Sequence, residues 1–207
     1  QSIVPQATMK VQFTSSWYDE QAEKSAAENL ISKGCVLISQ HADSWGAPTA
    51  CEAAGVPDVS YNGSTASKCP ETFLVSSRIN WSPYYDYVVN KVAAGESFPS
   101  DYVGTFETGS VELTEMGENV APGTQAAVMK AAAALASGND HVFATSKWTL
   151  NGEHLTSYLA DVDDAGDWVP ETEAIVTEGG KTFYAESKFR SAPYFDVDID
   201  GITEVTA

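Results

Sequence analysis

The sequence predicts an α/β fold in which a parallel sheet is flanked by helices. Short apolar runs at 35–39 and 72–76 are typical of strands that are covered on both faces. Segments with helical periodicity separate such runs, and the alternation of strand and helix favours parallel pairing. With 207 residues, 43% of them hydrophobic, the chain is long enough to bury a sizeable core.

The first predicted strand covers residues 9–15, where apolar and polar residues alternate and β-forming residues are frequent. A helix over 19–33 follows, because its apolar residues recur on one face and Gly34 stands where helices commonly end. The next three predicted elements are a strand at 35–39, a helix over 47–54 and a strand at 58–61.

A further strand at 72–76 precedes a predicted helix over 82–95, which carries Pro83 in its first turn. An alanine-rich helix is expected over 124–137, with a glycine directly beyond it. Its small side chains suit close packing against a sheet, so the alternation of strand and helix continues to this point.

From His141 onward the predicted elements are short β-strands separated by turns. A strand over 143–150 ends at Asn151-Gly152, a dipeptide that is a strong hairpin signal. The segment 193–200 alternates apolar residues with aspartates and predicts an edge strand with one face in water.

The charge of the chain limits its partners. Acidic residues outnumber basic residues 29 to 11, which gives a net charge of −18. This charge repels phosphate backbones, so nucleic acid is excluded as a partner. The sequence has no stretch of about 18 apolar residues and no signal-peptide pattern at its start.

Neither cysteines nor acidic runs predict a metal site. Cys35, Cys51 and Cys69 are odd in number and widely spaced, so they suggest neither a zinc site nor a disulfide framework, and they do not reveal the compartment. The run 196–201 imitates the start of a calcium loop, but the twelfth position, which requires glutamate, is Ala207.

Polar and aromatic residues follow the ends of the predicted strands. Ligands of an open parallel sheet bind beyond the carboxyl ends of its strands. Aromatic rings beside neutral hydrogen-bonding groups suit a flat polar heterocycle better than a phosphate, although the tryptophans could also simply cap the sheet. The candidate ligand-binding residues are Ser16, Trp17, His41, Asp43, Asn62, Asn80 and Trp81.

Signals for catalysis are weak. His41 and Asp43 lie two residues apart at a strand end, where both can point to the same face. No Gly-x-Ser-x-Gly elbow or activated cysteine accompanies them. We therefore expect no enzyme and no cofactor, and an α/β enzyme that uses His41 and Asp43 is kept as an alternative.

Several segments together resemble one known family. They are Val11–Asp19 (VQFTSSWYD), Gly34–Ser44 (GCVLISQHADS), Asn80–Tyr85 (NWSPYY), Phe189–Asp196 (FRSAPYFD) and Ile199–Ile202 (IDGI). In this order they resemble the basic membrane protein family of bacterial ABC-transporter substrate-binding lipoproteins. The matches span almost the whole chain.

The resemblance implies a Rossmann-like sheet in a two-lobed, type I periplasmic-binding-protein fold. Such a protein closes on a purine nucleoside between its lobes, delivers it to a membrane permease, and is extracytoplasmic and lipid-anchored. The chain then corresponds to the C-terminal part of a longer protein and lacks most of the first lobe. The expected divisions are a second-lobe core at 8–72, a crossover strand and helices at 73–140, and a β-rich segment at 141–207.

The residues of this sequence match the family's ligand-binding positions only in part. Trp17 occupies the position of the aromatic residue that stacks on the purine. Asn62 stands where nucleoside-binding members have an aspartate for the ribose, and Ile79 stands where they have a lysine. Asn80 and Trp81 follow as in one branch of the family and could supply a donor and a second ring. The resemblance leaves open a nucleobase, a differently held nucleoside, or a ligand-sensing ectodomain of the same fold.

Overall fold

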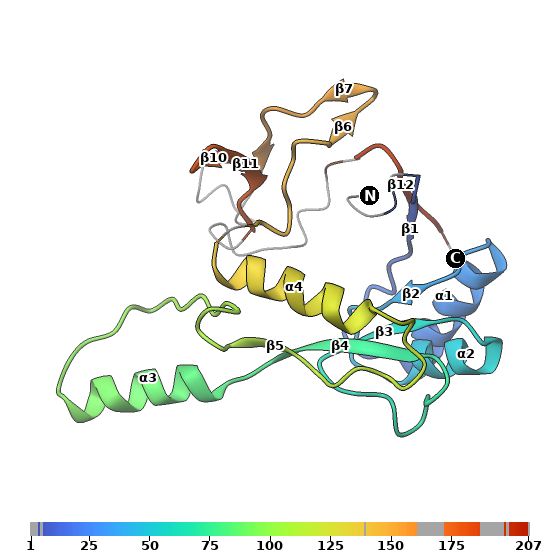
Figure 1. The fold of residues 1–207 in the computed structure, drawn as a ribbon, viewed down its shortest axis with the longest axis horizontal. Helices are drawn as coiled ribbons and strands as arrows, with labels where there is room; N and C mark the ends of the chain where they lie inside the picture. Colours follow the sequence, from blue (N-terminus) through green and yellow to red (C-terminus); the bar gives the residue numbers. More distant parts are fainter. Residues whose placement is uncertain are drawn as a thin grey trace. The chain divides into compact units, whose positions relative to one another are not determined.

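The computed structural model of the chain describes residues 4, 6–138, 140–160, 172–186, 197 and 199–206. The chain forms two compact units (Figure 1). The first comprises residues 1–11 with 137–203, and the second comprises residues 12–136 with 204–207.

The second unit contains a four-stranded sheet with the order β2-β3-β4-β5. Strands β2, β3 and β4 are parallel, and β5 is antiparallel to β4. The predicted parallel sheet with helices is thereby confirmed for these strands. Their bounds are Ile38–Ser39 for β2, Asp58–Tyr61 for β3, Phe73–Ile79 for β4 and Val111–Leu113 for β5.

The prediction that residues 9–15 form a strand of this sheet is wrong. Strand β1 (Met9–Val11) is shorter and pairs with β12 (Ile202–Glu204) in a separate two-stranded sheet. Beyond it, the Thr14 hydroxyl donates to the Ser16 carbonyl oxygen, and Ser15 adopts a left-handed backbone with a φ of 55°. Such local side-chain hydrogen bonds replace the ladder bonds of a strand.

Strand β2 is also shorter than predicted and lies at the edge of the sheet. The Cys35 amide still donates to the Leu30 carbonyl oxygen at the end of the preceding helix, at 3.1 Å. Val36 is 81% exposed and Leu37 is also exposed. The expectation that the run 35–39 is covered on both faces is therefore wrong for these two residues.

Helix α1 (Glu20–Ser32) matches its predicted bounds because its first turn is capped from both directions. The Asp19 carboxylate accepts a hydrogen bond from the Ala22 amide at 2.9 Å. The Asp19 amide in turn donates to Glu23 Oε1 at 3.0 Å. Reciprocal capping of this kind satisfies amides that have no partner within the helix.

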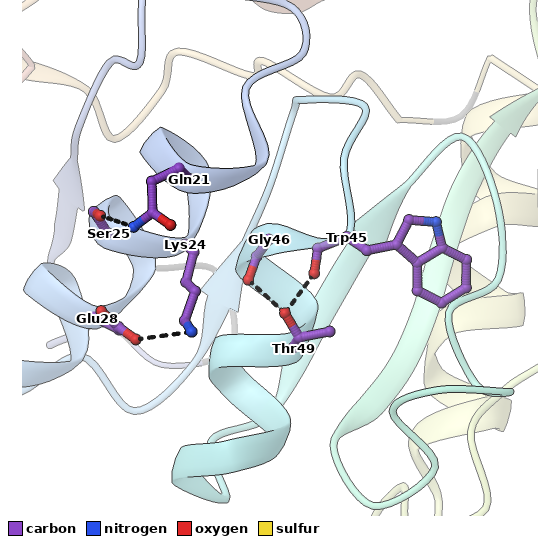
Figure 2. Close-up of polar contacts among 7 residues, drawn as sticks. All are labelled: Gln21, Lys24, Ser25, Glu28, Trp45, Gly46 and Thr49. Atoms are coloured by element: carbon purple, nitrogen blue, oxygen red, sulfur yellow. Dashed lines mark hydrogen bonds and ion pairs between the residues drawn. The ribbon is translucent and has the colours of Figure 1, made fainter.

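Helix α2 (Gly46–Ala54) begins directly against α1. A Cβ atom on Gly46 would lie 2.2 Å from the Glu20 carbonyl oxygen, so no side chain fits at this position. The Thr49 hydroxyl donates to the Trp45 and Gly46 carbonyl oxygens, at 2.8 and 3.0 Å, and so closes the first turn of α2 (Figure 2). The core between these helices and β2 consists of Ala27, Ile38, Ala47, Ala50 and Cys51.

Helices α3 (Ser82–Ala93) and α4 (Thr124–Ala136) lie where the sequence predicts them. In Figure 1, α3 continues the chain beyond the carboxyl end of β4. Neither helix contains a fully buried residue among its described side chains. Both therefore contribute less to the core of this unit than α1 and α2 do.

The first unit is built from short antiparallel strand pairs. The predicted Asn151-Gly152 hairpin is confirmed, and both turn residues have positive φ angles of 53° and 82°. The strand predicted over 143–150 is reduced to Thr149–Leu150 and an isolated bridge at Ala144. The strands are β6 (Thr149–Leu150) with β7 (Glu153–His154), β8 (Leu159–Ala160) with β9 (Thr172–Glu173), and β10 (Ile175–Glu178) with β11 (Lys181–Tyr184).

Two expectations fall mainly on residues that are not described. The predicted edge strand over 193–200 and the calcium-like run 196–201 lie largely outside the described residues. Within the described part of the chain, no helix is long and apolar enough to span a bilayer.

A carboxyl group is buried in the core of the second unit. Asp58, at the start of β3, is fully buried, and the Ser60 hydroxyl donates to its Oδ2 atom at 2.5 Å. Its Oδ1 atom has no hydrogen-bond partner among the described residues. Burial raises the pKa of Asp58 to about 6, and the hydrogen bond from Ser60 only partly offsets this.

The raised pKa of Asp58 makes a testable contribution to stability. The folded state holds the Asp58 proton more tightly than the unfolded state, so stability is lost as the pH rises from about 4 to about 6. Asp58→Asn removes this titration. The free energy of unfolding of the variant, relative to wild type, should therefore increase by about 2–3 kcal/mol between pH 4 and pH 7.5. Urea denaturation followed by circular dichroism measures this difference, and an equal difference at both pH values would contradict it.

Candidate functional site

The carboxyl ends of β2 and β3 frame a cavity of about 270 Å³ in the second unit. Its lining includes two of the predicted ligand-binding residues, Asp43 and Asn62. It also includes Gln40, Trp45, Tyr61 and Thr65, which are not among the predicted ligand-binding residues. The cavity is therefore at the edge of the sheet where a ligand site is expected.

Aromatic rings form a series beside this cavity. The ring centroids of Trp17 and His41 are 6.2 Å apart, and those of His41 and Tyr61 are 4.5 Å apart, both in edge-on geometry. The Asp43 amide donates to the Trp17 carbonyl oxygen at 3.0 Å. The structure thus brings together three predicted site residues, and it leaves Trp17 70% exposed.

Unusual backbone angles position the two turns that carry these groups. Ser15 and Asn62 have φ angles of 55° and 61°, in the left-handed region, which asparagine tolerates better than most residues. The Asn62 amide donates to the Ser77 carbonyl oxygen of β4 at 2.8 Å. The predicted Ser16 hydroxyl is used within its own turn, where it bonds to the backbone of Tyr18.

The loop after β2 is held by two buried or half-buried side chains. Glu23 Oε2 accepts a hydrogen bond from the Ser44 amide at 3.2 Å. Gln40 Nε2 donates to the Ala42 and Ser44 carbonyl oxygens, at 2.9 and 3.2 Å. Both amide protons of Gln40 are then used, and its buried Oε1 atom has no partner among the described residues. Gln40 therefore holds this loop in place and has no amide proton left to donate to the cavity.

The charges around the cavity are mixed. Burial raises the pKa of Tyr61, and the negative charge of Asp43 adds to the effect, so the Tyr61 hydroxyl stays protonated. The ammonium group of Lys68 lies 4.7 Å from the centre of the Trp45 ring, a cation–π contact. Among the described residues, no hydrogen bond joins His41 to Asp43, and no cluster of acidic, histidine and cysteine side chains could hold a metal ion.

The predicted residues Asn80 and Trp81 lie away from this cavity. Tyr61 pairs with Ser77, whereas β4 continues to Ile79, so Asn80 follows at roughly 10 Å beyond the end of β3 at about 3.3 Å per residue. Its side chain donates to the Gly109 carbonyl oxygen and accepts from the Ser82 amide.

The ring of Trp81 contacts those of Tyr84 and Tyr85 on α3 instead. Asn80 and Trp81 thus belong to the start of α3, while Trp17, His41, Asp43 and Asn62 belong to the cavity edge. Of the other lining residues, Gln40, Trp45 and Tyr61 have a signal in the sequence, because they end or follow predicted strands, whereas Thr65 has none.

Comparisons with known proteins identify relatives of most of this chain. The Bmp family, described as PnrA-like substrate-binding proteins of ABC transporters, matches residues 2–134. A Haloferax volcanii protein whose name assigns it to glucose binding in an ABC transporter, TsgA13, is 31% identical over 152 residues. A purine-binding protein of Brucella abortus is 33% identical over 85 residues. These matches cover 73% and 41% of this chain, and 35% and 24% of the respective relative.

Two solved structures are similar over 62% of this chain. A transcriptional activator of the comK gene from Bacillus halodurans has a TM-score of 0.55 at 17% identity, with 46% of its own chain covered. An ABC transporter solute-binding protein from Conexibacter woesei has a TM-score of 0.49 at 26% identity, with 44% covered.

The matched part of this chain therefore covers less than half of each of these four proteins. The family resemblance is confirmed by the match to residues 2–134, which is well over half of the chain and includes the motif segments at 11–19, 34–44 and 80–85. The chain belongs to the Bmp family of PnrA-like ABC transporter substrate-binding proteins.

Proposed function

We propose that this chain supplies one wall of the ligand site of an ABC-transporter substrate-binding protein, and that the ligand is a purine nucleoside or nucleobase. The observation that carries the proposal is the series of Trp17, His41 and Tyr61 rings beside a cavity lined by polar groups. A purine gains binding energy by stacking on such rings. The name of the Brucella relative supports the same ligand class.

The remaining parts of the proposal concern the whole protein. The relatives are longer than this chain, which supports a second wall supplied by a missing N-terminal lobe. Family membership supports an extracytoplasmic protein that delivers its ligand to a permease, and we infer a lipid anchor in the full-length protein. Binding and release require no catalytic residue, so we propose no enzymatic activity.

A sugar is the second candidate ligand. The Asp43 carboxylate is an acceptor that suits sugar hydroxyls, and the Haloferax relative is named for glucose binding. Calorimetry on the full natural protein with adenine, adenosine, guanine, guanosine and glucose tests both ligands. Glucose binding more tightly than every purine would overturn the purine proposal.

Trp17→Ala should weaken purine binding by about 1–3 kcal/mol, the range for base stacking on aromatic side chains. Because Trp17 is 70% exposed, the variant should keep the thermal stability of wild type. Tyr18→Ala is the matched control, since Tyr18 is adjacent and 61% exposed but lies outside the ring series. Equal affinities of the Trp17 variant and wild type in calorimetry would show that Trp17 does not contribute to ligand binding.

Asn62 should make the site discriminate weakly between a purine base and its nucleoside. A carboxylate can accept from two ribose hydroxyls through charge-assisted bonds, whereas an amide has one acceptor oxygen and also presents donors. We expect affinities for adenine and adenosine within about tenfold, or about 1.4 kcal/mol.

Asn62→Asp should shift the preference toward the nucleoside, and the left-handed backbone at this position accepts aspartate as well as asparagine. Calorimetry with both ligands on both proteins measures the ratio. A hundredfold preference of wild type for the nucleoside would show that another group, for example the Asp43 carboxylate in the same lining, already binds the ribose.

A further inference from the structure

A chain of hydrogen bonds leads from the wall of the cavity to the buried carboxyl group of Asp58. Thr65 lines the cavity and is only 6% exposed. Its Oγ1 atom lies 2.7 Å from Ser60 Oγ, and Ser60 Oγ lies 2.5 Å from Asp58 Oδ2. All three groups are fixed by strand β3 and the turn that follows it.

Counting protons fixes the direction of each bond. A hydroxyl group has one proton to donate, and an ionised carboxylate only accepts. The Ser60 proton is donated to Asp58, so the contact between Ser60 and Thr65 must use the proton of Thr65. Thr65 then has only oxygen lone pairs left for the cavity.

We propose that Thr65 is a specificity-determining residue whose hydroxyl accepts a hydrogen bond from an N–H or O–H group of the ligand, and that Asp58 sets this polarity through Ser60. The inference rests on the proposed function, because it requires that the cavity at the ends of β2 and β3 holds the ligand. The Asp43 carboxylate, which also lines the cavity, is an acceptor that favours the same kind of ligand.

Protonation of Asp58 allows the direction of these hydrogen bonds to reverse. The Asp58 hydroxyl can then donate to Ser60, Ser60 to Thr65, and Thr65 into the cavity, where it opposes a ligand donor. Because Asp58 titrates near pH 6, this reversal falls within an accessible pH range.

Neighbouring groups do not interfere with this titration. Asp58 faces the thiols of Cys51, from α2, and Cys69, from the segment before β4. Burial raises their pKa values to about 12 and about 11, so both stay neutral near pH 6. Glu52 and Lys68 act on Cys69 with opposite charges. The residues paired with Asp58 on β2 and β4, Ile38 and Phe73, carry no charge.

The test measures the dissociation constant of the full natural protein at pH 5, 6, 7 and 8, by calorimetry with adenosine, guanosine, adenine, guanine and glucose. For the ligand that binds most tightly, wild type should bind about three- to tenfold more weakly at pH 5 than at pH 8. This factor corresponds to the net contribution of one hydrogen bond. Thr65→Val should lose about the same factor at pH 8, and its loss of affinity between pH 8 and pH 5 should be about three- to tenfold smaller than that of wild type. Asp58→Asn should reduce the pH dependence by the same factor, while any contribution of His41 stays in both variants.

Ser64→Ala is the matched control, because Ser64 lines the same cavity but lies outside the chain of hydrogen bonds. It should keep the pH profile of wild type. If a ligand binds and Thr65→Val retains the wild-type profile, the inference is wrong while the proposed function stands.

A second measurement decides the inference without a ligand. Carbon-13 NMR of the Asp58 carboxyl group should give a higher titration midpoint in Thr65→Val than in wild type, because Ser60 loses the donor that strengthens its own bond to Asp58. If none of the five ligands binds, the proposed function is wrong, and an unchanged midpoint would overturn the Thr65 inference as well.

Discussion

The close contact between α1 and the start of α2 is the constraint on which the candidate site depends. Gly46 permits this contact, because any Cβ atom would collide with the backbone of α1. At this distance the buried Glu23 carboxylate reaches the Ser44 amide and fixes the loop that follows β2. The same loop carries His41 and Asp43 to the turn of Trp17, so the ring series is a consequence of helix packing.

The hydrogen-bonding character of the cavity depends on which side-chain protons are already donated to other groups of the protein. Gln40 donates both amide protons to backbone carbonyl oxygens, and Ser60 donates its hydroxyl proton to Asp58. Thr65 and Asp43 therefore present acceptors to a ligand, beside the donors of Asn62 and Tyr61, and the net charge of −18 disfavours phosphorylated compounds. Aromatic faces beside acceptors favour an uncharged ring that carries hydrogen-bond donors.

Sequence patterns located the helices within about two residues because caps and glycines mark their ends, as Asp19 and Gly55 do. The strand at 9–15 was predicted wrongly because alternation identifies an extended segment but not its partner. The sequence groups Asn80 and Trp81 with the other site residues because both follow a predicted strand at 72–76, but β4 continues to Ile79, past the end of β3. The offset between β3 and β4 depends on register, which the sequence does not reveal. The role of Thr65 depends on the tertiary contact to Ser60.

Alkylation of Cys51 and Cys69 can report the local opening of the structure around the sheet. Both are fully buried beside Asp58, and their raised pKa values keep them from forming the reactive thiolate at neutral pH. An alkylating reagent can reach them only when α2 and the segment before β4 separate from the strands. The rate of modification of these native cysteines therefore reports the free energy of that local opening, and ligand that stabilises the closed form would slow it.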